Sequence, residues 1–327
     1  MTFNNSGREI GSGMNTAVCT LRSPAVTDAR RGIQARNSSK HGLMTSDGVE
    51  IAVTDYRPSG PISHTVVLLH GLCLSRRSWY LTYRPLCQPG VRVIAYDHRG
   101  HGQSGSAALA TYTPQRLGQD LAELLTALNV VGPLTIAGHS MGGMSALSYL
   151  ARPLNDQPVR PNALVLVGTS AGGLTECGLG RLLVAPGLGA LIEVATHAPR
   201  ALGERAVRAL AQPLCGLVTH DASVTKSLAE ALGRTPMRTS LGFLQALKAF
   251  DQRTILPSIS ASTTVISGGR DILTPPTHSE HMAALIPNAT HLHLPDAGHM
   301  LLQEATDIVT GAILRTITDA ESIGAPA

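Results

Sequence analysis

The chain has 327 residues, of which 43% are hydrophobic and 15% charged, a composition that suits a compact globular enzyme and excludes extensive disorder. Lys and Arg outnumber Asp and Glu by 26 to 22, and residues 1–44 contain six basic residues but only two acidic ones. The rest of the chain is therefore neutral, which excludes a basic face for nucleic-acid binding.

Residues 1–44 are rich in Ser, Asn, Thr and Arg and have no sustained apolar periodicity, so we expect a disordered extension. The segment lacks the apolar stretch of a secretory signal, and none follows the Arg30-Arg31 pair. An Arg-rich and acid-poor start also fits a transit peptide. The expected location is the cytoplasm, with a transit peptide or peripheral membrane association as alternatives.

The chain contains five cysteines, an odd number without C-x-x-C spacing, which indicates free thiols rather than a disulfide framework or a zinc site. No uninterrupted apolar run reaches the roughly 18 to 20 residues of a membrane-spanning helix. No transmembrane segment is therefore expected.

Two strands around the turn at Asp47-Gly48 are expected over residues 43–57. Beyond them, short apolar runs without period-two alternation are typical of parallel strands buried on both faces. These runs are residues 65–69, 91–96, 134–137, 163–167 and 263–267. Expected helices separate or follow them at 114–128, 141–151, 277–286 and 301–318. This alternation predicts an α/β protein with a doubly wound, mostly parallel sheet.

Roughly 95 residues separate the strand that ends near Gly168 from the strand that begins near Thr263, which is too long for an ordinary connection. The segment contains a helical apolar period from Met237 that includes Leu244 and ends beside Phe250. We therefore predict a helical lid over 171–256, inserted into a core of 45–170 and 257–322. Leu244 and Phe250 are candidates for lining a substrate pocket.

A nucleophile motif follows the strand expected at 134–137. The motif is G-x-S-x-G, here Gly138-His139-Ser140-Met141-Gly142. A serine on a sharp strand-to-helix turn has a strained backbone with positive φ, and Gly138 and Gly142 leave space for it. The N-terminus of the following helix directs N–H groups toward developing negative charge, so the Met141 N–H is a candidate oxyanion donor.

A serine hydroxyl needs a base within hydrogen-bond reach and a carboxylate that orients the base. Asp271 follows the buried strand expected at 263–267, and His299 lies in the loop after a short strand at 290–294. Because the carboxyl ends of parallel strands meet at one edge of a sheet, we expect Ser140, Asp271 and His299 to form a catalytic triad there.

Four blocks of the sequence, spread over roughly residues 45 to 320, resemble the α/β-hydrolase family. They are His70-Gly71-Leu72, the run Asp97-His98-Arg99-Gly100-His101-Gly102-Gln103-Ser104, the motif around Ser140, and Gly268-Gly269-Arg270-Asp271 with Ala297-Gly298-His299. The resemblance implies that the Leu72 N–H is the second oxyanion donor and that Arg99 and Ser104 hold loops near the site. Four residues beside these turns complete the candidate pocket: His70, Gly71, Cys73 and Met300.

Several rival interpretations compete with these assignments. Asp296 could supply the carboxylate in place of Asp271, whereas His139 is expected to pack beside the site rather than act as the base. Cys73 is expected to be a small buried hydrophobe rather than a reactive thiol. Four histidines resemble a metal cluster but lack a metal-binding motif, so no metal is expected; they are His278, His281, His291 and His293.

The resemblance implies a serine hydrolase of the esterase, lipase or lactonase type that acts through an acyl-enzyme and needs no cofactor. The expected partner is a small-molecule ester, or another acyl substrate with an apolar acyl group. Acyl transfer, carbon–carbon bond hydrolysis and cofactor-free haloperoxidase chemistry use the same triad and remain alternatives, as does a non-catalytic binding protein. The sequence leaves the acyl chain and the oligomeric state open.

Overall fold

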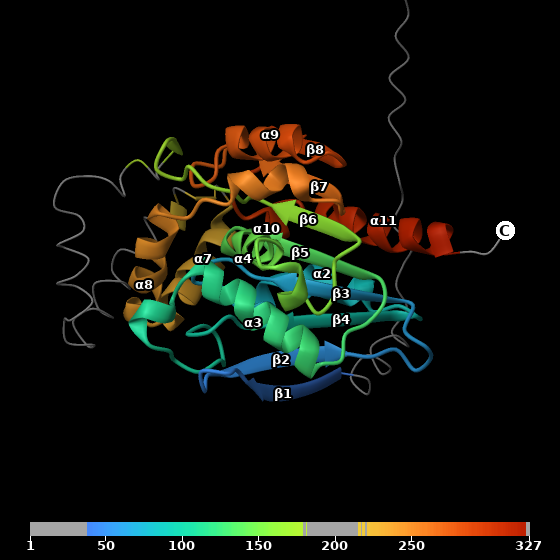
Figure 1. Cartoon of the computed structure of the whole chain (residues 1–327). Helices are drawn as coiled ribbons and strands as arrows, with labels where there is room; N and C mark the ends of the chain where they lie inside the picture. The colour runs from blue at the N-terminus through green and yellow to red at the C-terminus, as the bar shows by residue number, and fades with distance from the viewer. Residues whose placement is uncertain (1–37, 179–180, 182–214, 217, 220, 325–327) are drawn as a thin grey trace, which may run out of the picture.

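The computed structural model describes residues 38–178, 181, 215–216, 218–219 and 221–324 (Figure 1). In this part of the chain, eight strands form one sheet of order β1-β2-β4-β3-β5-β6-β7-β8. The strands are β1 (Ser38–Met44), β2 (Glu50–Tyr56), β3 (His64–Leu69), β4 (Val91–Tyr96), β5 (Leu134–His139), β6 (Ala163–Val167), β7 (Ser262–Gly268) and β8 (Ala289–Leu294). The sheet is antiparallel from β1 to β4 and parallel from β4 to β8, which confirms the expected mostly parallel α/β sheet.

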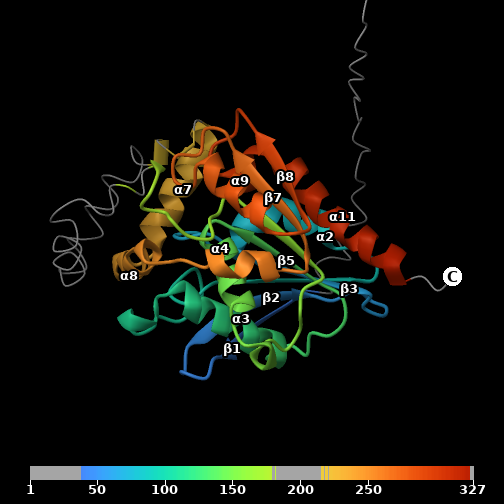
Figure 2. The same ribbon diagram turned by 45° about the horizontal axis from the view of Figure 1, so that its top comes forward.

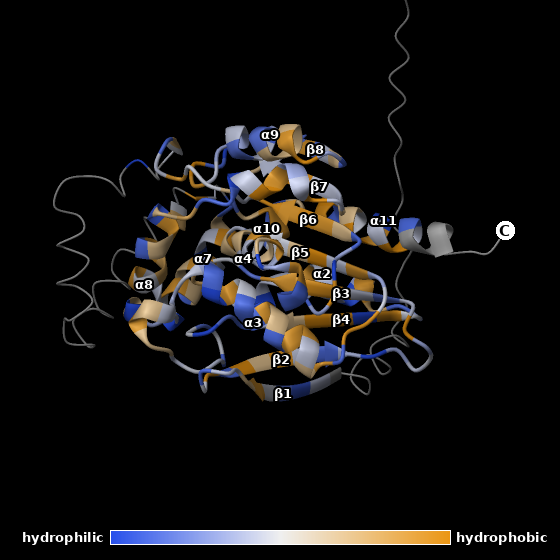
Figure 3. Ribbon diagram, in the orientation of Figure 1, coloured by the Kyte–Doolittle hydropathy of each residue, from blue (hydrophilic) through white to orange (hydrophobic). Residues whose placement is uncertain are grey.

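Helices cover both faces of the sheet (Figure 2). One face packs against α3 (Pro114–Ala127), α4 (Met141–Leu150) and α9 (Pro276–Leu285), and the other against α2 (Tyr80–Leu86), α10 (Leu301–Glu304) and α11 (Thr306–Gly324). Short 3₁₀ helices connect these elements: η1 (Arg76–Trp79), η2 (Leu109–Thr111), η3 (Leu154–Asp156) and η5 (Arg253–Ser258). In β3, Val67 and Leu69 face one core while Val66 and Leu68 face the other, so residues 66–69 of the strand are apolar on both faces (Figure 3).

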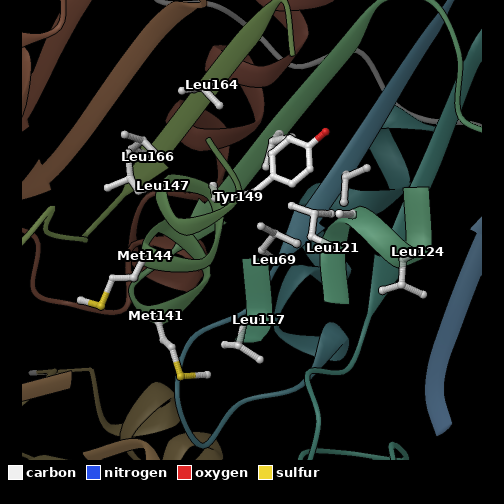
Figure 4. Packing of buried hydrophobic residues seen from close by; sticks show 14 of the residues in the cluster. Leu69, Leu117, Leu121, Leu124, Met141, Met144, Leu147, Tyr149, Leu164 and Leu166 are labelled. Atoms are coloured by element: carbon white, nitrogen blue, oxygen red, sulfur yellow. The ribbon is translucent and has the colours of Figure 1, made fainter. Parts of the chain in front are cut away.

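The contact between α3 and α4 forms the centre of the larger core (Figure 4). Helix α3 begins where the Thr113 side chain accepts a hydrogen bond from the N–H of Arg116, with Pro114 in the first turn. Its leucines, including Leu117 and Leu121, are fully buried. A side chain at Gly118 would collide with the α4 backbone, so this glycine permits the close approach of the two helices. The packing fixes the position at which α4 begins, and hence that of Ser140.

Two boundaries differ from the expectation. Residues 38–44 are not part of a disordered extension, because β1 pairs along its whole length with β2, with Leu43 opposite Ile51. Residues 1–37 lie outside the described residues. The single helix expected at 301–318 is two helices, because Ala305 leaves helical backbone angles at φ −139° and ψ 41°.

The insertion after β6 contains α7 (Ala222–Arg234) and α8 (Met237–Lys248), which lie together at one end of the sheet in both views (Figures 1 and 2). Its two ends meet, because Gly172 pairs with Asp251 and the N–H of Gln252 donates to the carbonyl of Ala171. Leu256 is buried in the main core, so η5 belongs to the core rather than to the predicted lid. Residues 182–214 of the predicted lid lie outside the described residues. No helix in the described ranges is long and apolar enough to cross a membrane.

Candidate active site

Ser140 lies on a tight turn between β5 and α4. Its backbone has φ 53° and ψ −121°, a conformation that costs a residue with a side chain on the order of 1–3 kcal/mol. The turn is so tight that only glycine fits beside it. A side chain at Gly138 would meet the backbone of Gly142 and Gly143, and one at Gly142 would meet the carbonyl of Leu69. Ser140 itself remains partly exposed at the sheet edge. The local sequence therefore places the Ser140 hydroxyl on a strained backbone turn at the edge of the sheet.

Ser140, His299 and Asp271 form a continuous hydrogen-bonded chain. The His299 Nε2 is 3.0 Å from the Ser140 Oγ, and its Nδ1 is 2.7 Å from Oδ2 of Asp271. His299 and Asp271 are 4% and 3% exposed. An ionised carboxylate can only accept, so Nδ1 carries the proton and Nε2 presents its lone pair to the serine hydroxyl. The three residues thus meet at the edge where sequence reasoning expected them.

The Asp271 carboxylate is held by the turn that follows β7. Its Oδ1 accepts the N–H groups of Leu273 and Thr274, both at 2.9 Å, and its Oδ2 accepts the Thr274 hydroxyl at 2.7 Å. Burial alone would raise the pKa of Asp271, but His299 and these donors outweigh it and hold the pKa below its ordinary value. Sequence reasoning missed Thr274, although Asp followed three residues later by Thr is a recognisable Asx-turn pattern.

The loop that carries His299 is fixed through its backbone. The carbonyl of His299 accepts a hydrogen bond from His139 Nε2 at 2.9 Å, and its N–H donates to the carbonyl of Val218. The Glu304 carboxylate accepts the N–H of Gly298. His139 is fully buried, and burial lowers its pKa to about 3, so its ring is neutral and serves as a donor. This contact agrees with the expectation that His139 packs beside the site.

Two backbone N–H groups close to Ser140 have no acceptor among the described residues: that of Met141, the next residue, and that of Leu72, whose neighbour Gly71 lies against the Ser140 side chain. Within the described residues, neither the N–H of Leu72 nor that of Met141 donates a hydrogen bond. The turn around Leu72 is held by its neighbours: the N–H of Leu74 donates to the carbonyl of Gly71, and the N–H of Cys73 donates to His101 Nε2. The two free donors have the chemistry of an oxyanion hole.

Three residues of the candidate pocket, His70, Gly71 and Cys73, lie in or beside the turn that carries Leu72. Both ring nitrogens of His70 form hydrogen bonds: Nδ1 donates to the carbonyl of Gly71, and Nε2 accepts from the N–H of His98. Cys73 is buried at φ 60°, with its thiol 3.2 Å from Ser240 Oγ, which fits the expected packing role. Gly71 lies directly over His139 and the Ser140 side chain.

The apolar candidates have different surroundings. Met300, next to His299, packs with Leu74 and with Val224 of α7 in a small separate cluster. Leu244 of α8 is half-buried. Phe250 is 2% exposed and packs within the main core, and its assignment to the pocket stays a prediction.

The block at Asp97 is a structural turn. The Asp97 carboxylate accepts from Arg76 and from the N–H of Gln103, and the Ser104 hydroxyl donates to the Asp97 carbonyl. The Arg99 guanidinium is fully buried and ion-paired with Asp120. Arg99 and Ser104 therefore hold loops, as the resemblance implied.

The residues considered for rival roles, Asp296 and the histidines outside the triad, have other partners in the structure. Asp296 is ion-paired with Arg270 at the surface, where its side chain is 89% exposed. His291 and His293 both contact the Ser267 hydroxyl, and His278 lies between Ser170 and Cys177. Across the described ranges, no group of three or more His, Cys, Asp or Glu side chains has a metal-binding arrangement.

Comparison with known proteins places this geometry in a family. The sequence profile of the alpha/beta hydrolase fold matches residues 64–306. A putative carbamate hydrolase, RutD of Variovorax paradoxus, is 29% identical over 83% of this chain and 98% of its own length. The sn-1-specific diacylglycerol lipase ABHD11 of Mus musculus is 30% identical over 72% of this chain and 74% of its own.

Solved structures agree with the sequence comparison. A thermophilic esterase from Thermogutta terrifontis superposes with a TM-score of 0.68 at 25% identity, over 86% of this chain and 98% of the esterase. The sheet order, the strained serine turn and these similarities lead to one conclusion. The chain belongs to the α/β-hydrolase fold family.

Proposed function

We propose that the protein is a serine hydrolase that cleaves carboxylic esters through an acyl-enzyme. The observation that supports this most is the hydrogen-bonded chain from Ser140 through His299 to Asp271, beside two unpaired backbone N–H groups. His299 Nε2 accepts the Ser140 proton as Oγ attacks the acyl carbon. The N–H groups of Leu72 and Met141 stabilise the oxyanion, and the protonated His299 then donates to the leaving alcohol. Water, activated in the same way by His299, releases the acid.

The ionised Asp271 keeps the imidazole oriented and stabilises its charged form during both steps. The three hydrogen bonds from Leu273 and Thr274 keep the carboxylate in place without neutralising it. No step needs a cofactor. Because the four described cysteines are free thiols, we also propose that the enzyme acts in the cytoplasm.

On the substrate side we propose an apolar acyl group, since each buried methylene contributes about 0.8 kcal/mol. The expected length is about four to ten carbons, because the chain has only three Phe and one Trp to build a deep pocket and glycines interrupt the predicted lid. The apolar cluster of Met300, Leu74 and Val224 lies next to His299 and joins the core to α7. This buried cluster makes the wall between His299 and α7 apolar, and an apolar wall favours apolar chains over charged ones. The predicted lid over 171–256 would cover this side.

A series of p-nitrophenyl esters from acetate to decanoate tests this function. We expect kcat/KM to rise by about three- to fourfold per carbon until the pocket is filled. Leu244→Asp should flatten the gradient and spare acetate, whereas Gln245→Asp, at an exposed position on the same helix, should leave it unchanged. An aryl carbamate belongs in the same series, because one relative is named a putative carbamate hydrolase. Turnover of the carbamate alone would refute the ester assignment.

A further inference from the structure

A second nucleophile and base lie together outside the triad. The Cys177 Sγ is 3.0 Å from His278 Nε2, and His278 Nδ1 is 3.0 Å from the Ser170 Oγ. The three side chains line a cavity of about 300 Å³ at the C-terminal end of β6 and beside α9, together with Thr277, His281 and Arg253. Neither the triad nor the two oxyanion donors line this cavity.

The hydrogen bonds around Ser170 determine which nitrogen of His278 carries the proton. The Ser170 hydroxyl has one hydrogen and donates it to the carbonyl of Gly172. It therefore accepts from its two other partners, the N–H of Gly172 and His278 Nδ1. With the proton on Nδ1, Nε2 presents a lone pair to the Cys177 thiol. The thiol thus donates to a base, in the arrangement that converts a cysteine into a nucleophile.

Burial lowers the pKa of His278 below its ordinary value, so the ring is neutral near pH 7 and its Nε2 is unprotonated. The other contact of the thiol, with the hydroxyl of Thr277, is much longer at 3.9 Å. Cys177 is only half-buried, so a small molecule in the cavity reaches its sulfur.

The other cysteines in the described ranges have no such base. Cys87 is also half-buried, but its thiol donates to the backbone carbonyl of Tyr83, and burial raises its pKa to about 12. Burial likewise raises the pKa of Cys73 to about 11, and Cys215 is buried too. Cys87 therefore shares the half-buried class of Cys177 but differs in its partner and in the burial of its thiol, so it serves as an internal reference for the labelling rate.

We propose that Cys177, with His278 as its base, is a covalent modification site for small α,β-unsaturated carbonyl compounds. The thiol proton passes to His278 Nε2 as Sγ bonds to the β-carbon and the carbon–carbon π bond breaks. The resulting enolate then takes a proton at its α-carbon from the imidazolium. The net reaction adds S–H across the double bond, and no oxidant or further reactant takes part. This chemistry is independent of the esterase reaction at Ser140.

The test uses N-ethylmaleimide on the full-length folded protein at pH 7, with the adducts quantified by peptide mass spectrometry over time. Cys177 should be labelled about tenfold or more faster than Cys87, because a thiolate is the attacking species. Ser140→Ala should leave this ratio unchanged, since the two sites are separate. Labelling after unfolding in urea should bring the two rates together.

Variants of the base separate reactivity from exposure. His278→Gln removes the base and should slow labelling of Cys177 to about the Cys87 rate. Ser170→Ala removes the acceptor that keeps the proton on His278 Nδ1 and should slow labelling less. The Cys87 rate in the same sample reports whether each variant is folded. Equal rates at the two cysteines in the parent protein, or a Cys177 rate that His278→Gln does not change, would overturn the proposal.

Discussion

Two polar clusters lie at the same edge of the sheet, and they differ in how completely their hydrogen bonds are satisfied. The five N–H donors of Arg99 are all used, by Asp120, Asp47 and the Thr111 hydroxyl. In the triad, by contrast, the Ser140 hydroxyl is partly exposed and two neighbouring N–H groups have no acceptor among the described residues. A saturated cluster holds the chain together, whereas an unsaturated one can bind and transform another molecule.

The largest effect should follow from removing the nucleophile. Ser140→Ala should lower kcat on an ester by about 10⁶-fold, because no other side chain at this turn can form the acyl-enzyme. The fold should persist, since alanine keeps the same backbone and Cβ, and thermal melting would check this. Residual turnover within about a hundredfold of the parent would place the nucleophile elsewhere.

Replacing the acid should have the next largest effect. Asp271→Asn should lower kcat by about 10⁴-fold, because an amide cannot stabilise the imidazolium and favours the wrong tautomer. Asp296→Asn is the matched control, since Asp296 is paired only with Arg270 at the surface, and such exposed pairs are worth about 0–1 kcal/mol. Steady-state kinetics on one ester would measure both. The reverse order of effects would assign the carboxylate to Asp296.

A substitution in the Arg99 cluster should lower the stability of the fold rather than the catalytic rate. Asp120→Asn leaves the buried Arg99 charge without its fully buried partner and should lower the free energy of unfolding by about 3–5 kcal/mol. Urea denaturation would measure the loss, and kcat of the folded variant should remain close to the parent value. A variant with normal stability and strongly reduced kcat would show that the Arg99 cluster takes part in catalysis.

Local patterns explain what could be predicted from the sequence. The apolar strands, the stripe on α3 and the glycines around Ser140 each record a local requirement for burial or close approach. The order of the strand ends then places Asp271 and His299 beside the serine. These features depend on the nearby sequence and on the rule that parallel strands end at a common edge.

Features that depend on tertiary contacts were not predictable in the same way. Residues 38–44 resemble the polar tail by composition and become a strand only because β2 supplies the hydrogen bonds. Phe250 follows a helical apolar stripe, yet its side chain turns into the main core. Cys177 and His278 are 101 residues apart, and no local pattern joins them.

Labelling with a fluorophosphonate tests the central claim most directly, because this reagent reports a serine that a working triad activates. On the folded parent protein, intact mass should show a single adduct, and peptide mapping should place it on Ser140. Asp271→Asn should slow the labelling, and Ser140→Ala should abolish it. An adduct on another residue, or a folded protein that takes up no label, would contradict the account and favour a non-catalytic binding protein on this fold.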